Sequence, residues 1–170
     1  MESINIHPLV VHFPIALLSI YSFLECARLR KLQQLSFWFG LKAFLVITGS
    51  VIGILALQSG DWMKHLFMGG NFQSVVELHE FLGDWSIYLY LLIAFSYVIK
   101  SLKLQNVWES NAWFQKIVSL NAKIFCVPVL VIFAIVAFIL LVLTGALGAV
   151  LVHGPDIDTG VTIIYEFFFP

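Results

Sequence analysis

The chain has 170 residues, of which 61% are hydrophobic and 11% are charged, and its mean hydropathy is +0.97. A water-soluble domain of this length cannot bury so much apolar surface, so the composition excludes a soluble globular protein. The formal net charge is −1 and the only basic cluster is Arg28-Leu29-Arg30-Lys31, so the charge pattern gives no indication of nucleic-acid binding.

Four apolar runs of about twenty residues or more follow one another along the chain. A helix of this length crosses the hydrocarbon core of a bilayer and bonds its own backbone N–H and C=O groups internally. The sequence therefore predicts an all-α fold, a four-helix bundle that forms one transmembrane domain over residues 1–170. The predicted spans are 8–27, 37–57, 78–99 and 124–152, joined by loops at 28–36, 58–77 and 100–123 and followed by an aromatic tail at 153–170.

The basic residues predict the orientation in the membrane. Of the nine Lys and Arg residues, only Lys64 lies on the side that carries the two termini. Basic residues concentrate in cytoplasmic segments, so we expect both termini on the outer, periplasmic side of a bacterial inner membrane. The N-terminal segment lacks the basic residues of a cleaved signal peptide, so we expect the first span to be retained. The residues expected on the cytoplasmic side are Arg28, Arg30, Lys31, Lys42, Lys100, Lys103, Lys116 and Lys123.

Common catalytic motifs are missing from the sequence. It contains no GxSxG, P-loop, HExxH or Gly-rich nucleotide-binding motif, so a non-catalytic subunit is favoured over an enzyme. Cys26 and Cys126 occur in neither CxxC nor CxxCH, which gives no support to covalent haem attachment or to a thiolate zinc site. We expect both thiols to be inert.

The histidines gather toward one end of the predicted bundle. All five map to the outer half, at His7, His12, His65, His79 and His153. A polar ring about a turn and a half inside a span is costly when it faces lipid, so His12 is predicted to face the bundle interior. His7 precedes a proline that suits a first helical turn, so it is predicted to fold over the mouth of the bundle.

Helical spacing predicts the packed faces of the first and third spans. Residues three and four apart share a face, and each of these two spans carries a histidine above small or polar residues on such a face. The opposite face of the third span, with Leu82, Trp85, Leu89 and Leu92, is predicted to face lipid. The predicted inner faces are His12, Ala16, Ser19, Phe23 and Cys26 in the first span, and His79, Gly83, Ser86, Tyr90 and Tyr97 in the third.

Two inward imidazoles on facing helices suit a b-type haem. Haem takes axial imidazole ligands from facing helices, and small residues let the flat macrocycle approach the backbone. We therefore predict that His12 and His79 bind the haem iron, with His7 and His153 as supporting residues or as part of a second haem site. Gly49, Gly53 and Gly83 are the predicted small contacts. The alternative for the GxxxG spacing of Gly49 and Gly53, and for Gly145 with Ala149, is plain helix packing.

Several segments resemble those of a widespread family of small predicted membrane proteins of unknown function. The opening His7-Pro-Leu-Val-Val-His12-Phe-Pro-Ile-Ala-Leu is similar to the family's HPxxVHFPIAL motif. Thr48-Gly49, Gly60-Asp61-Trp62 and His79 match further family positions. The segment Thr144-Gly145-Ala-Leu-Gly148-Ala-Val-Leu151-Val152-His153-Gly154 resembles its TGxxGGxLVYxxG closing motif, except that Ala149 and His153 replace a glycine and an aromatic residue.

The resemblance implies a four-helix membrane protein, and some relatives resemble this domain fused to c-type cytochrome domains. That association favours an electron-transfer subunit between membrane quinol and an outer c-type cytochrome. One alternative is a structural anchor or assembly subunit in which the histidines are incidental. Another is an outer copper or zinc site formed by His7, His65, His79, His153 and nearby acids, or by His153 with Asp156 and Asp158.

Overall fold

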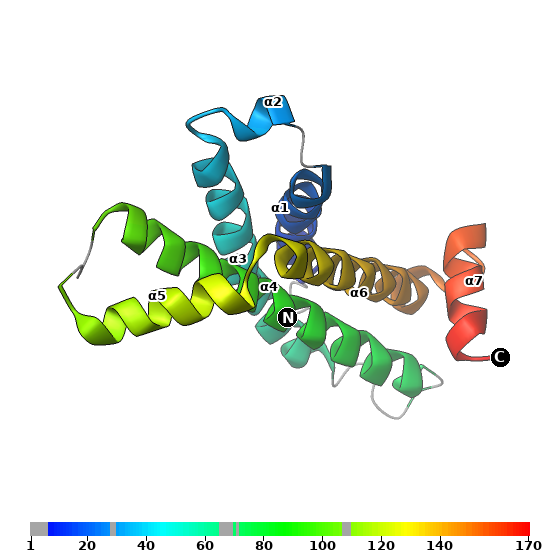
Figure 1. The fold of residues 1–170 in the computed structure, drawn as a ribbon. Helices are drawn as coiled ribbons and strands as arrows, with labels where there is room; N and C mark the ends of the chain where they lie inside the picture. Colours follow the sequence, from blue (N-terminus) through cyan, green and yellow to red (C-terminus); the bar gives the residue numbers. More distant parts are fainter. Residues whose placement is uncertain (1–6, 28–29, 65–69, 71, 107–109) are drawn as a thin grey trace.

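The computed structural model describes residues 7–27, 30–64, 70, 72–106 and 110–170, and these are almost entirely helical (Figure 1). Four of the helices are long and apolar enough to cross a membrane. This confirms the prediction of an all-α protein with four helices that could span a membrane. These helices are α1 (His7–Ala27), α3 (Trp38–Lys64), α4 (Gln73–Leu104) and α6 (Val127–His153).

The helices α3 and α4 extend beyond the predicted spans. The polar segment at 58–64 continues α3, and α4 begins before and ends after the predicted 78–99. Hydropathy detects only the apolar part of a helix, whereas helical hydrogen bonding continues into polar residues at either end. In the bundle α1 packs on α3 and α6, while α4 packs on α3 and α6.

Three shorter helices occupy segments that were expected to be loops or tail. They are α2 (Arg30–Gln33), α5 (Ala112–Ile124) and α7 (Thr159–Phe168). The Asn111 side chain caps α5 by accepting hydrogen bonds from two backbone amides, and α5 folds back beside the end of α4 (Figure 1). Asp158, considered above as a cation ligand, instead caps α7, which packs against α6.

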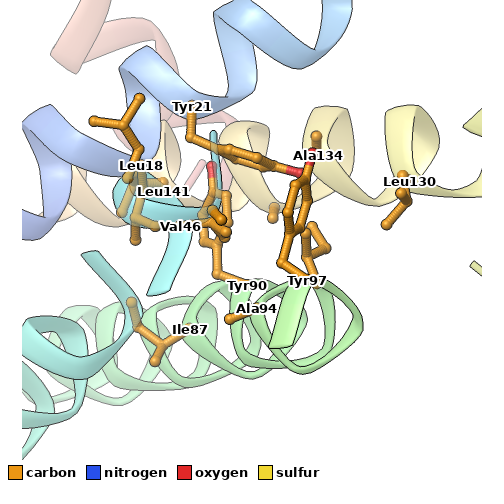
Figure 2. Packing of buried hydrophobic residues seen from close by; sticks show 14 residues of the cluster. Leu18, Tyr21, Val46, Ile87, Tyr90, Ala94, Tyr97, Leu130, Ala134 and Leu141 are labelled. Atoms are coloured by element: carbon orange, nitrogen blue, oxygen red, sulfur yellow. The ribbon is translucent and has the colours of Figure 1, made fainter. Parts of the chain in front are cut away.

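The core of the bundle contains three tyrosine rings among aliphatic side chains (Figure 2). Tyr21 of α1 meets Tyr90 and Tyr97 of α4 edge to face, with ring centroids 6.4 and 5.9 Å apart. Leu18 of α1 and Val46 of α3 are fully buried beside them. Edge-to-face contacts of this kind stabilise a pair by about 0.5–1.5 kcal/mol beyond the area it buries.

The predicted inner face of α1 is wrong. Phe23, placed on that face, has 71% of its side chain exposed, and His12 is exposed as well. The buried face is Pro14, Leu18, Tyr21, Ser22 and Glu25. In a membrane helix both faces can be apolar, and bundle interfaces favour small and polar residues, so large apolar residues such as Phe23 do not mark the interior.

The predicted inner face of α4 is confirmed from Gly83 onward. Gly83, Ser86, Tyr90 and Tyr97 are all buried. On the opposite face Trp85 and Leu92 are about half exposed as expected, but Leu82 is buried against α6 and α7 residues.

Gly49 and Gly53 make close contacts between helices. A Cβ atom at Gly49 would lie 2.7 Å from Cδ2 of Leu18 in α1, and one at Gly53 would lie 2.6 Å from Cδ1 of Ile87 in α4. At Gly49 the added Cβ would also lie 2.8 Å from Cγ of Leu18, so the close approach of α3 to α1 depends on the missing side chain. At Gly53 only the end of the Ile87 side chain is this near. This observation favours the helix-packing interpretation for Gly49.

Replacing Gly49 by alanine is expected to lower the free energy of unfolding in detergent by about 1–3 kcal/mol, because fully buried Leu18 has no space to move aside. The measurement is unfolding by SDS followed by circular dichroism. Gly40→Ala in the same helix is the control, since no atom lies within 4 Å of the added Cβ. Equal stability of the two variants would contradict this account of the packing.

Candidate functional site

A cavity of about 470 Å³ lies among α1, α3, α4 and α6, and four histidines line it. His7 and His12 come from α1, His79 from α4 and His153 from the end of α6. His65 falls outside the described residues. The structure thus brings the four predicted histidines that it describes to one cavity. The residues that line the cavity come from all four long helices.

His79 is held against α6 by its Nδ1 atom. Nδ1 lies 2.9 Å from the backbone carbonyl oxygen of Thr144. A carbonyl can only accept, so Nδ1–H is the donor, and a neutral ring then carries its lone pair on Nε2. Gly148 leaves room for the ring, because a Cβ atom there would lie 3.2 Å from Cε1 of His79.

His12 is held in a similar way but within its own helix. Its Nδ1 donates to the backbone carbonyl of Pro8, one turn earlier. The same reasoning leaves Nε2 of His12 unprotonated in the neutral ring. The side chain is exposed rather than packed in the interior, so it lines the cavity from an open side.

His7 begins α1 and lies against α3. Its Nδ1 is 2.8 Å from the Ser59 hydroxyl oxygen, and that hydroxyl donates to the carbonyl of Ala56. Ser59 therefore accepts from His7, which makes Nδ1–H the donor once more. Gly60 provides the space, since a Cβ atom there would lie 3.2 Å from Cε1 of His7.

The depth match expected between His12 and His79 is found instead between His7 and His79. His7 lies beside Gly60 near the end of α3, and Lys64 in that last turn forms an ion pair with Glu80, the neighbour of His79. His12 is five residues further along α1, about 7.5 Å deeper at 1.5 Å per residue.

The predicted glycines separate into two groups. Gly53 and Gly83 line the cavity, whereas Gly49 is not among its lining residues. Gly83 also lies close to α6, because a Cβ atom there would be 3.3 Å from Cγ2 of Thr144. The cavity floor between these glycines is apolar, formed in part by Ile87 and Leu141.

The donor set distinguishes a bare metal ion from a haem. Among the described residues no three His, Cys, Asp or Glu side chains are grouped closely enough to hold one ion. Protein zinc sites take three or four such ligands, whereas a haem iron needs one or two axial residues. The described residues, His153, Asp156 and Asp158 among them, therefore offer no group of three such ligands for an isolated copper or zinc ion.

Sequence reasoning missed the groups that hold the histidines. Four residues lie against a histidine ring from another helix, namely Thr144, Gly148, Ser59 and Gly60. The segments quoted for the family resemblance include three of them, but Ser59 was not singled out.

Comparisons with protein-family models, with curated proteins and with solved structures give no match. The family resemblance therefore stays a prediction.

Replacing Gly148 by alanine is expected to displace the His79 ring and weaken its hydrogen bond to Thr144. In ¹⁵N NMR of histidine-labelled protein, the wild-type His79 signals should report the Nδ1–H tautomer, and the variant should show a mixture of tautomers. Gly145→Ala is the matched control on the same helix, because nothing lies within 4 Å of its added Cβ. A wild-type ring protonated on Nε2 would refute the assignment.

Proposed function

We propose that this protein is a membrane electron-transfer subunit that binds b-type haem in the cavity formed by α1, α3, α4 and α6. The observation that carries the proposal is the set of histidines on that one cavity, with Nδ1 of both His79 and His12 donating to backbone carbonyls. A bound haem supplies a one-electron redox centre at this position.

The local geometry suits His79 as an axial ligand. Metal-binding histidines usually donate their second ring nitrogen to a carbonyl or carboxylate, which fixes the tautomer and increases the basicity of the ligating nitrogen. His79 has this arrangement, and Gly148 places the ring against α6. The second ligand would come from α1, where His12 is the predicted residue and His7 is the one at the depth of His79.

The cavity also has a suitable size and lining. Cofactor pockets commonly measure about 300–1,000 Å³ and are mainly apolar with a few polar groups. The cavity here has about 470 Å³, an apolar floor and histidines around it. Gly53 and Gly83 are the lining residues without side chains that would leave room for a flat cofactor.

The position of the cavity is consistent with transfer between membrane quinol and an outer c-type cytochrome. It lies at the end of the bundle where α1 begins and α3 ends, whereas Lys42 and Lys100 lie toward the opposite end. If the basic end is cytoplasmic, as the charge distribution predicts, the cavity would open toward the periplasmic side of a bacterial inner membrane, where we expect both termini. Electrons from quinol would then leave toward an outer acceptor.

The test is a visible spectrum of the protein purified after expression with haem supplied. We expect a Soret band that shifts on reduction and that His79→Ala abolishes. His12→Ala and His7→Ala identify the second ligand, because only loss of the true ligand converts a six-coordinate spectrum to a five-coordinate one. His153→Ala, at the exposed end of α6, is the control and should keep the ligation. Absence of a Soret band in the wild-type protein rejects the proposal.

The second candidate is a structural anchor, which the close packing at Gly49 and Gly53 favours. In that case alanine at His12 or His79 leaves activity of the assembled complex unchanged, while substitutions at the two glycines disrupt assembly. The outer copper or zinc site needs His65, and His65→Ala would reduce metal content only if that alternative holds.

A further inference from the structure

A buried carboxylate lies at the other end of the bundle from the histidines. Glu25, in the last turn of α1, is only 3% exposed. Its Oε2 atom accepts hydrogen bonds from Nζ of Lys42 in α3 and from the Tyr97 hydroxyl in α4, both at 2.8 Å. The Tyr21 hydroxyl lies 3.4 Å from the same oxygen. Three helices therefore meet at one carboxylate.

The other titratable groups near Glu25 are Lys42 of α3, Lys100 of α4 and its neighbour Cys26 in α1. Nζ of Lys42 and Nζ of Lys100 each lie 5.8 Å from the centre of the Tyr97 ring, and Lys100 donates to the carbonyl of Phe125. Cys26, next to Glu25, is exposed. The α6 residues in this part of the core are apolar, Leu130 and Ala134 among them. One acid thus faces two bases, and Lys42 reaches the surface with 16% of its side chain exposed.

A purely structural role does not account for this cluster. Burying an ion pair costs desolvation energy that its attraction often fails to recover, and apolar side chains of similar volume commonly serve as well. Ionisable residues inside membrane bundles instead mark ion pathways and proton relays. The two tyrosine hydroxyls add a specific property, because a hydroxyl can donate to an ionised Glu25 and accept from a protonated one. The site can therefore hold a proton without losing its partners.

A second pair of buried hydroxyls lies between Glu25 and the histidine end of the helices. Ser22 Oγ and the Tyr90 hydroxyl are 2.7 Å apart, and Ser22 precedes Glu25 by about one turn of α1 while Tyr90 precedes Tyr97 by about two turns of α4. Figure 2 shows the Tyr21, Tyr90 and Tyr97 rings gathered between the helices. Ser50, fully buried on α3 between Gly49 and Gly53, has no hydrogen-bond partner among the described residues.

We propose that Glu25 is a proton-transfer site open to the basic end of the bundle and linked to the cavity by these hydroxyls. A hydronium ion at the surface gives its proton to the Glu25 carboxylate, which becomes neutral. The carboxyl then gives one proton to a tyrosine hydroxyl, and each later hydroxyl or water accepts one proton and releases one. The last hydroxyl releases its proton to water in the cavity, and each hydroxyl turns back before the next transfer. One positive charge has then moved along the bundle. The proposal does not depend on bound haem.

The experiment is voltage-driven proton flux into vesicles. The full chain is reconstituted in phosphatidylethanolamine–phosphatidylglycerol vesicles that contain a pH-sensitive dye, and a potassium gradient with valinomycin sets the voltage. We expect flux above that of protein-free vesicles and its loss to that level in Glu25→Gln. Tyr97→Phe, which removes one hydroxyl, should also reduce the flux. Tyr88→Phe, half exposed on the same helix, is the matched control and should behave as wild type.

The outcomes separate proton transfer from a structural ion pair. Wild-type flux equal to that of protein-free vesicles overturns the proposal, and so does full flux in both Glu25→Gln and Tyr97→Phe. Size-exclusion profiles and helical content show whether the variants are folded. If Glu25→Gln fails to fold, Tyr97→Phe decides, together with infrared spectra of the wild-type protein. A titrating, D₂O-exchanging carboxyl band that shifts in Tyr97→Phe belongs to Glu25 and supports the site, and carboxyl bands that are identical in the two proteins refute it.

Discussion

The need to satisfy polar groups within a bundle surrounded by lipid controls this structure. Backbone groups do so by forming helices, and the few polar side chains inside must find partners on neighbouring helices. His79 finds the Thr144 carbonyl, His7 finds Ser59, and Glu25 finds Lys42 and Tyr97. Each of these contacts joins two different helices. The polar side chains therefore set which helix faces meet, while the large apolar residues are free to face outward.

The two polar regions differ in what they can do chemically. At one end, imidazoles line an apolar cavity, and each neutral ring has one unprotonated nitrogen whose lone pair can bind a ligand. At the other end, a carboxylate lies among bases and hydroxyls and can exchange a proton. The tyrosine and aliphatic core between them keeps the dielectric constant low, so charge moved at one end acts on the other more strongly than it would through water.

Local properties of the sequence were sufficient to predict the four long helices, but they did not predict which residues of these helices contact each other. Apolar length identified the four long helices, and spacing identified the inner face of α4 because Gly83, Ser86 and Tyr90 are small or polar there. On α1 the same reasoning chose the face of Phe23, because hydrophobic character does not distinguish a lipid-facing side from a packed one. Glu25 was the available signal, as the single acid within the first span. The contact of His79 with Thr144 joins residues 65 apart in the chain, and no local pattern encodes such a pair.

The glycine motifs acquire a physical explanation once the histidines are placed. Thr144 and Gly148 are one turn apart on α6, so they share a face and act on one ring, the first by accepting the Nδ1–H of His79 and the second by leaving space for Cε1. Ser59 and Gly60 do the same for His7 at the end of α3. The opening histidine segment and the closing Thr-Gly segment are thus parts of one cavity, although nearly the whole chain separates them. A side chain at Gly60 or Gly148 would press on an imidazole ring, since its Cβ would lie 3.2 Å from Cε1 of His7 or of His79. The two glycines therefore act on the lining of the cavity.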